Sequence, residues 1–168
     1  CGRDGALSGD DTEGMHPSRK ALAEATNPRH VHGSLKEVLK GADVFIGVSS
    51  GNILDPADIE TMADDAIVFA LANPTPEVDP IGAGKYAAVV ATGRSDYPNQ
   101  INNVLAFPGL FRGLLDAKVK EITTEVLRVA AVAIASVISE DELSPSYIIP
   151  GAFDKRVAPA VSKAVRRA

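Results

Sequence analysis

The sequence predicts an α/β fold in which a parallel sheet is flanked by helices and followed by extra C-terminal helices. Three short apolar runs, continuous as in strands that are covered on both faces, alternate with helical patterns up to about residue 116. Two helical patterns then follow with no strand between them. Such alternation favours right-handed crossovers and a doubly wound, Rossmann-like sheet.

Capping and turn residues set the bounds of the expected elements. Pro17 suits the first turn of a helix, and Ser34 with Glu37 forms a capping box for the next one. Pro108 falls inside a later helical pattern and predicts a kink there. The expected helices cover residues 16–26, 35–40, 55–64, 103–116, 123–138 and 153–167, with a short helical turn at 79–80; the expected strands cover 43–48, 66–72 and 87–92, and 144–150 is an extended linker.

Composition narrows the possible partners. The 168 residues carry a net charge of -5 with no basic stripe, so nucleic acid is not expected as a partner. The apolar runs are too short to span a membrane. Cys1 is the only cysteine, which excludes an internal disulfide and suits the cytoplasm.

The first residues resemble the end of a strand and the loop after it, so we expect this chain to be a piece of a longer one. In a nucleotide-binding sheet, an acidic residue at the end of the second strand binds the ribose 2′-hydroxyl, whereas an arginine accommodates a 2′-phosphate. Gly2 and Arg3 at this place favour NADP over NAD. An exposed arginine at a turn explains Arg3 equally well.

Three patterns that could indicate ligand sites have simpler explanations. The run from Gly82 to Ala87 matches a dinucleotide fingerprint, but a strand follows it where a helix is required. His30 and His32 have no third metal ligand nearby, which favours a surface loop. The acidic residues at 10, 11 and 13 are typical of a solvated loop rather than a cation site.

Polar residues follow each predicted strand, at the edge where parallel sheets bind ligands. Ser49, Ser50 and Gly51 allow a ribose or phosphate to approach the backbone, although an ordinary turn has the same composition. Asn73 lies on a turn that prolines make rigid. Asn102 and Asn103 offer amides at a helix start, where capping requires only one of them.

Arg94 follows the third strand and has two possible roles. Its guanidinium can bind a carboxylate bidentately, or it can form a surface ion pair with Asp96. The sequence leaves both open.

Four motifs, two of them long, resemble the C-terminal, cofactor-binding half of bacterial malic enzymes. They are residues 41–48, 69–77, 91–113, and 147–150 with 153–156. The resemblance covers nearly the whole chain, which would then be the C-terminal portion of a dinucleotide-binding domain over residues 1–168. It implies NADP- or NAD-dependent oxidative decarboxylation of malate to pyruvate and carbon dioxide.

The resemblance also implies roles for individual residues. Asn73 would lie between malate and the nicotinamide, and Asn102 and Asn103 would hold the substrate, with Asn102 also facing the cofactor. Residues 49–51 and Arg3 would bind the cofactor. The general base, the acid, the glycine-rich loop and the ligands of Mg²⁺ or Mn²⁺ have no match here, so we expect them elsewhere in a longer protein and expect these 168 residues alone to be inactive.

Two other functions are compatible with the sequence. One is another hydroxy- or amino-acid dehydrogenase with the same sheet, and the other is a non-catalytic nucleotide-binding module. The family resemblance suggests a homodimer or a higher homo-oligomer.

Overall fold

The computed structural model describes residues 1–10 and 12–168 and contains the predicted parallel sheet. Its strands are β1 (Val44–Gly47), β2 (Ile67–Ala70) and β3 (Val89–Thr92), in the order β1-β2-β3. Gly47 pairs with Ala70, and Ala70 pairs with Thr92. The three carboxyl ends therefore lie level at one edge, and the predicted α/β class is confirmed.

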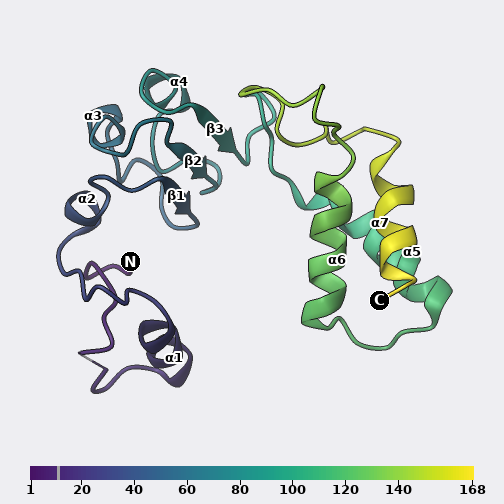
Figure 1. The fold of residues 1–168 in the computed structure, drawn as a ribbon, viewed down its shortest axis with the longest axis horizontal. Coiled ribbons are helices and arrows are strands. Elements are labelled where there is room, and N and C mark those ends of the chain that lie inside the picture. The colour runs from purple at the N-terminus through teal and green to yellow at the C-terminus, as the bar shows by residue number, and fades with distance from the viewer. Residues whose placement is uncertain (11) are drawn as a thin grey trace.

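Four helices belong to the sheet-containing half of the molecule (Figure 1). They are α1 (Pro17–Ala25), α2 (Leu35–Val38), α3 (Pro56–Ile59) and α4 (Pro80–Ala83). The capping box of α2 is confirmed, because the Ser34 N–H donates to Glu37 Oε2 at 2.7 Å. The core of this half includes Phe45, Leu54, Ile59, Val68 and Val78, all of which are buried.

Helix α3 is shorter than predicted because tertiary hydrogen bonds take over after its first turn. The Thr61 carbonyl accepts from the Gly41 N–H at 2.8 Å, and the Ala63 N–H donates to the Ala42 carbonyl at 3.1 Å. These groups bind the turn before β1 instead of continuing the helix. The predicted end of this helix, at residue 64, was therefore wrong, because α3 ends at Ile59.

A second hydrophobic core lies among the C-terminal helices. The short 3-10 turn η1 (Asn103–Leu105) leads into α5 (Phe107–Ala117), which α6 (Thr124–Ala135) and α7 (Val157–Val165) follow. In Figure 1 these helices lie side by side, apart from the sheet. Within the part of the chain that the structure describes, no helix is long and apolar enough to cross a membrane.

Close packing of α5 on α7 depends on two glycines. A Cβ on Gly109 would lie 2.6 Å from Val161 Cβ, and one on Gly113 would lie 2.7 Å from Val165 Cβ. Real Cβ atoms do not approach so closely, so side chains at either glycine would force the two helices apart.

The predicted kink at Pro108 was wrong. Helix α5 begins at Phe107, which places Pro108 in the first turn. A first-turn N–H has no intrahelical partner, so proline fits there without disturbing the helix. The preceding residues form η1 instead of extending α5.

The last two helices and the linker between them also differ from the prediction. Residues 153–156 precede α7 as a turn, in which Asp154 Oδ1 accepts from the Arg156 N–H at 2.8 Å. Helix α6 ends at Ala135, three residues before the predicted end at residue 138. The linker folds back on itself, because Ser144 and Tyr147 form an isolated antiparallel bridge.

Candidate functional site

The candidate site is built on the edge where the three strands end. The first and second strands run into the segments around Ser49 and Asn73. The chain after β3 makes a loop and returns, because the Ile101 N–H donates to the Thr92 carbonyl at 2.8 Å. This return brings Asn102 back to the strand end, so the sheet gathers all three polar segments at one edge, as predicted.

A buried carboxylate joins the first two of these segments. Glu77 is fully buried, and its Oε1 accepts from the Ser49 N–H at 2.7 Å and from Ser49 Oγ at 3.1 Å. Its Oε2 accepts from the Ala72 N–H at 2.9 Å. No role for Glu77 was predicted from the sequence. The local sign of its burial is its place between Pro76 and the buried Val78.

Backbone contacts strengthen the same junction. The Asn52 N–H donates to the Pro76 carbonyl at 2.9 Å, and the Leu54 N–H donates to the Glu77 carbonyl at 3.0 Å. A Cβ on Gly47 would lie 2.5 Å from Glu77 Cδ, so this strand end has no room for a side chain. The two segments therefore form one rigid unit.

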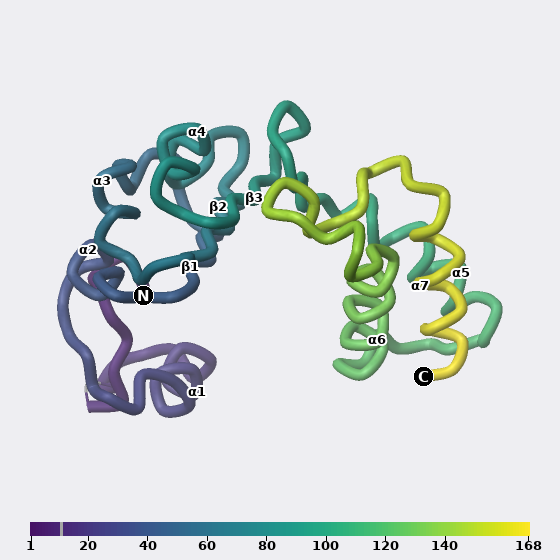
Figure 2. The backbone as a smooth tube through the Cα atoms, turned by 45° about the horizontal axis from the view of Figure 1, so that its top comes forward, coloured from purple at the N-terminus to yellow at the C-terminus, as the bar shows by residue number. Residues whose placement is uncertain are grey.

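A cavity of about 820 Å³ lies against β1 and is lined by three of the predicted cofactor residues, Arg3, Ser49 and Ser50. All three are exposed. Figure 2 shows the N-terminus beside β1, which explains how Arg3 reaches this cavity. Gly51 lies next to the lining, and a Cβ there would come within 2.6 Å of Thr75.

The lining fits a ligand with a phosphate and a sugar. The guanidinium offers a positive charge, the serines offer hydroxyls, and apolar side chains of β1 and α2 form much of the remaining wall. The volume falls in the range of small-molecule and cofactor sites.

The three asparagines lie on the same sheet edge but outside the lining of this cavity. Asn102 caps η1, because its Oδ1 accepts from the Val104 N–H at 3.0 Å. Asn73 and Asn103 are exposed, and among the described residues neither side chain forms a hydrogen bond. Their amides are therefore available to a ligand, whereas the Oδ1 of Asn102 already has a structural partner.

Arg94 forms the surface ion pair. Its Nε and Nη2 donate to the two carboxylate oxygens of Asp96, at 2.8 and 2.5 Å, and its guanidinium lies 5.3 Å from the centre of the Tyr97 ring. The hydrogen bonds from Arg94 lower the pKa of Asp96. Of the two alternatives for this arginine, the structure contains the ion pair.

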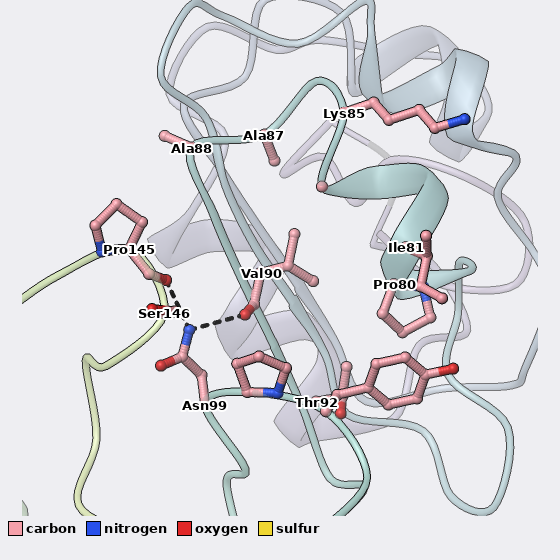
Figure 3. A pocket seen from close by; sticks show the side chains of 13 residues that line it. Pro80, Ile81, Lys85, Ala87, Ala88, Val90, Thr92, Asn99, Pro145 and Ser146 are labelled. Atoms are coloured by element: carbon pink, nitrogen blue, oxygen red, sulfur yellow. Dashed lines mark hydrogen bonds between the residues drawn. The ribbon is translucent and has the colours of Figure 1, made fainter.

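Asn99 connects the sheet to the linker before α7. Its Nδ2 donates to the carbonyls of Val90 and Pro145, at 3.0 and 2.8 Å, as Figure 3 shows. Its Oδ1 accepts from the Ile148 N–H at 2.9 Å. The residue is buried at the side of a second cavity, of about 410 Å³, between β3 and α4.

The rejected dinucleotide fingerprint has the structure that the sequence predicted. Gly82 lies in α4, Gly84 ends that helix, and β3 follows. The helix that a fingerprint requires after its glycines is therefore replaced by a strand, and the rejection is confirmed.

The histidines meet an acidic residue. His30 Nδ1 lies 2.7 Å from Asp10 Oδ2, and His32 Nε2 lies 3.7 Å from the same atom. Hydrogen bonds from Ser8 and then His30 lower the pKa of Asp10. Across residues 1–10 and 12–168, no three histidine, cysteine or acidic side chains form a group that could hold a metal ion; residue 11 of the acidic loop lies outside the described residues.

The chain is similar to known proteins over almost its whole length. The family model described as "Malic enzyme, NAD binding domain" matches residues 2–167. The chain is 55% identical to an NAD-dependent malic enzyme of Geobacillus stearothermophilus, over 97% of this chain and 34% of that protein. It is 52% identical to a bifunctional malic/malolactic enzyme of Bacillus subtilis, over 100% of this chain and 41% of that protein.

Solved structures show the same similarity. The NAD-dependent malic enzyme of Thermotoga maritima superimposes with a TM-score of 0.88 at 46% identity, over 98% of this chain and 43% of that one. A malic enzyme of Pyrococcus horikoshii gives a TM-score of 0.87 at 45% identity, over 96% and 38%. The chain thus spans between a third and a half of the length of the relatives named here.

Proposed function

The chain belongs to the malic enzyme family through its NAD-binding domain, and from this premise we propose that it serves NADP- or NAD-dependent oxidative decarboxylation of malate to pyruvate and carbon dioxide. One observation carries the proposal. A single sheet edge holds both a cavity with cationic and hydroxyl groups and, outside that cavity, exposed amides without protein partners. A cofactor and a small polar acid bound at this edge would lie next to each other.

Residues 1–168 act in this proposal as the C-terminal portion of a dinucleotide-binding domain. Arg3, Ser49, Ser50 and Gly51 bind the cofactor, and the positive charge of Arg3 favours NADP over NAD. A nicotinamide cofactor held by these residues would supply the hydride acceptor for the oxidation of malate. The junction at Glu77 keeps the Ser49 hydroxyl fixed while the ligand binds.

The asparagines hold malate against the cofactor. Each amide supplies two donors and an acceptor, which suit the carboxylates and the hydroxyl of malate. Asn73, which follows the central strand β2, contacts both malate and the nicotinamide, the role that the family resemblance implies for it. Asn103 binds substrate with its unpartnered amide, and Asn102 uses the NH₂ group that its cap leaves over for substrate or cofactor.

The remaining parts of the reaction belong to the whole protein. We place the general acid, the general base and the ligands of Mg²⁺ or Mn²⁺ outside these 168 residues, and expect the isolated chain to be inactive with malate. A metal held there would polarise the malate oxygens as a Lewis acid. A cytoplasmic, homo-oligomeric enzyme is part of the same proposal.

Two substitutions in the whole protein test the substrate site. Asn73→Ala and Asn103→Ala should each lower kcat with malate roughly 30- to 900-fold, by analogy with the loss of one orienting donor in a transition state. Both residues are exposed, so thermal unfolding should not change. Ser95→Ala, at an exposed position in the loop after β3, is the control and should keep wild-type kinetics. Wild-type kcat and KM in both asparagine variants would contradict the proposal.

A further inference from the structure

The hydrogen bonds of Glu77 decide what kind of group Ser49 can bind. We propose that Glu77 is a positioning residue that fixes the Ser49 hydroxyl as a hydrogen-bond acceptor, so that this end of the cavity binds a ribose hydroxyl of the dinucleotide and not a phosphate. The inference rests on the proposed function, because it specifies how the proposed cofactor lies in the cavity.

The direction of one hydrogen bond sets the role of the Ser49 hydroxyl. A glutamate carboxylate has acceptors only. The proton on Ser49 Oγ is therefore directed to Glu77 Oε1, which lies 3.1 Å away. The lone pairs of the hydroxyl remain for the cavity, and they can accept from a sugar hydroxyl but cannot donate to a phosphate oxygen.

The Ser49 backbone is unable to take over the donor role. Its N–H also donates to Glu77 Oε1, at 2.7 Å. Both donors of this residue are thus turned away from the cavity, although the side chain itself is exposed. In phosphate-binding loops, by contrast, backbone N–H groups point at the ligand.

Charge favours the same orientation. Glu77 is fully buried, and among the described residues no cation pairs with it, so its negative charge acts on the loop above it. Arg3 lines the same cavity and supplies its positive charge. A phosphorylated ligand is therefore attracted to the Arg3 part of the lining and repelled from Ser49.

The same carboxylate also reaches the substrate side. Its Oε2 accepts from the N–H of Ala72, the residue directly before Asn73. One buried side chain thereby fixes the hydroxyl that faces the sugar and the backbone that carries the proposed substrate amide.

The first experiment removes the acceptor in the whole protein. Affinities for NAD are measured by calorimetry, together with those for four analogues that each lack one ribose hydroxyl. Ser49→Ala should weaken NAD binding about fivefold to tenfold, as expected for one lost hydrogen bond. One deoxy analogue should bind the wild type and Ser49→Ala equally, because each change removes the same bond. Ser95→Ala, the control, should bind all five ligands as the wild type does.

Competition by inorganic pyrophosphate shows whether Ser49 faces a ribose or the phosphates of the cofactor. If Ser49 faces a ribose, Ser49→Ala should leave the inhibition constant of pyrophosphate within about twofold of wild type, a change well below that of one lost hydrogen bond. Weaker pyrophosphate inhibition in Ser49→Ala than in wild type would overturn the inference. The inference would also fail if each of the four analogues bound Ser49→Ala more weakly than wild type, because none of the missing hydroxyls would then be the partner of Ser49.

The second experiment tests Glu77 itself. Glu77→Gln places an amide donor against Ser49 or Ala72 and should weaken NAD binding at least fivefold, while the double variant with Ser49→Ala should lose less affinity than the product of the two single losses. The control is Glu140→Gln, at an exposed turn. If Glu77→Gln melts below the assay temperature, Glu77→Asp replaces it, because the shorter side chain withdraws the acceptor and should give the same loss.

The outcomes distinguish the two proposals. A whole protein that binds neither NAD nor NADP refutes the proposed function and this inference together. A protein that binds NAD but shows wild-type affinity in the Ser49 and Glu77 variants refutes only the inference.

Discussion

Replacing Asn99 should destabilise the protein, because its side chain connects two parts of the chain. Asn99 is buried and ties β3 to the linker before α7 through three hydrogen bonds of 2.8 to 3.0 Å. The partners of the Asn99 side chain in these bonds are the carbonyls of Val90 and Pro145 and the N–H of Ile148. The bonds connect the sheet half to the chain that enters the helical core, so their loss affects both halves.

The size of the effect follows from the bonds and from the backbone. Each hydrogen bond contributes about 1 kcal/mol to the free energy of unfolding, so Asn99→Ala should lose roughly 3 kcal/mol. The φ angle of 55° at Asn99 is left-handed, and alanine there should lose roughly 1 kcal/mol more. Asn99→Gly accepts this φ and removes the same bonds, so the two variants differ by the strain alone, apart from the greater freedom of glycine in the unfolded chain.

Urea unfolding of wild type and variants measures these differences. The neighbouring Gln100→Ala is the matched control, since its side chain makes one long hydrogen bond, of 3.4 Å, to the Gly93 carbonyl. It should lose less than about 0.5 kcal/mol, in keeping with so weak a contact. A loss below roughly 1 kcal/mol in Asn99→Ala would refute the connecting role, because even one buried unpaired group should exceed it.

Three further predictions concern other parts of the chain. Arg3→Ala in the whole protein should reduce the preference for NADP over NAD, and an unchanged ratio of kcat/KM values would discard the phosphate contact. Gly109→Ala should lose roughly 1–3 kcal/mol in urea unfolding through overpacking against α7, whereas Gly151→Ala, with open space around its Cβ, should match wild type. The pKa of the Asp10 carboxyl, measured by NMR, should lie below 3.8 and should rise in Ser8→Ala. The stability that this carboxyl contributes is therefore present above pH 3.8 and is lost as the pH falls through the lowered pKa. An unchanged pKa in Ser8→Ala would exclude the hydrogen bond from Ser8 as the cause of the lowered pKa.

Local signals predicted the order of the elements well. Each strand was found from a continuous apolar run, and α2 from its capping box, because both signals lie in adjacent residues. The expected cover on both faces of the strands was wrong for β1, where Val44 and Ile46 are 49% and 62% exposed. The ends of elements were less predictable. Helix α3 stops early because Thr61 and Ala63 bond to residues 41 and 42, which are distant in sequence.

The polar residues of the site show the same limit. Arg94 and Asn102 were both predicted as possible ligand-binding residues, and the structure gives the first an ion pair with Asp96 and uses the Oδ1 of the second as a helix cap. A ligand amide and a structural amide have the same chemistry. They differ only in whether a protein group at long range satisfies them, and no local pattern contains this information.

Glu77 explains why the edge can remain exposed and still be ordered. Loops at strand ends lose the hydrogen bonds of the sheet, and exposed hydroxyls or amides cannot replace them, because water competes for these groups. A fully buried carboxylate that accepts three hydrogen bonds fixes the loop at Ser49 and the backbone before Asn73 from below. Because the ordering bonds are made on the buried side, Ser50 and Asn73 need no structural partner of their own. The solvent-exposed side of this sheet edge is therefore available for a ligand without loss of stability.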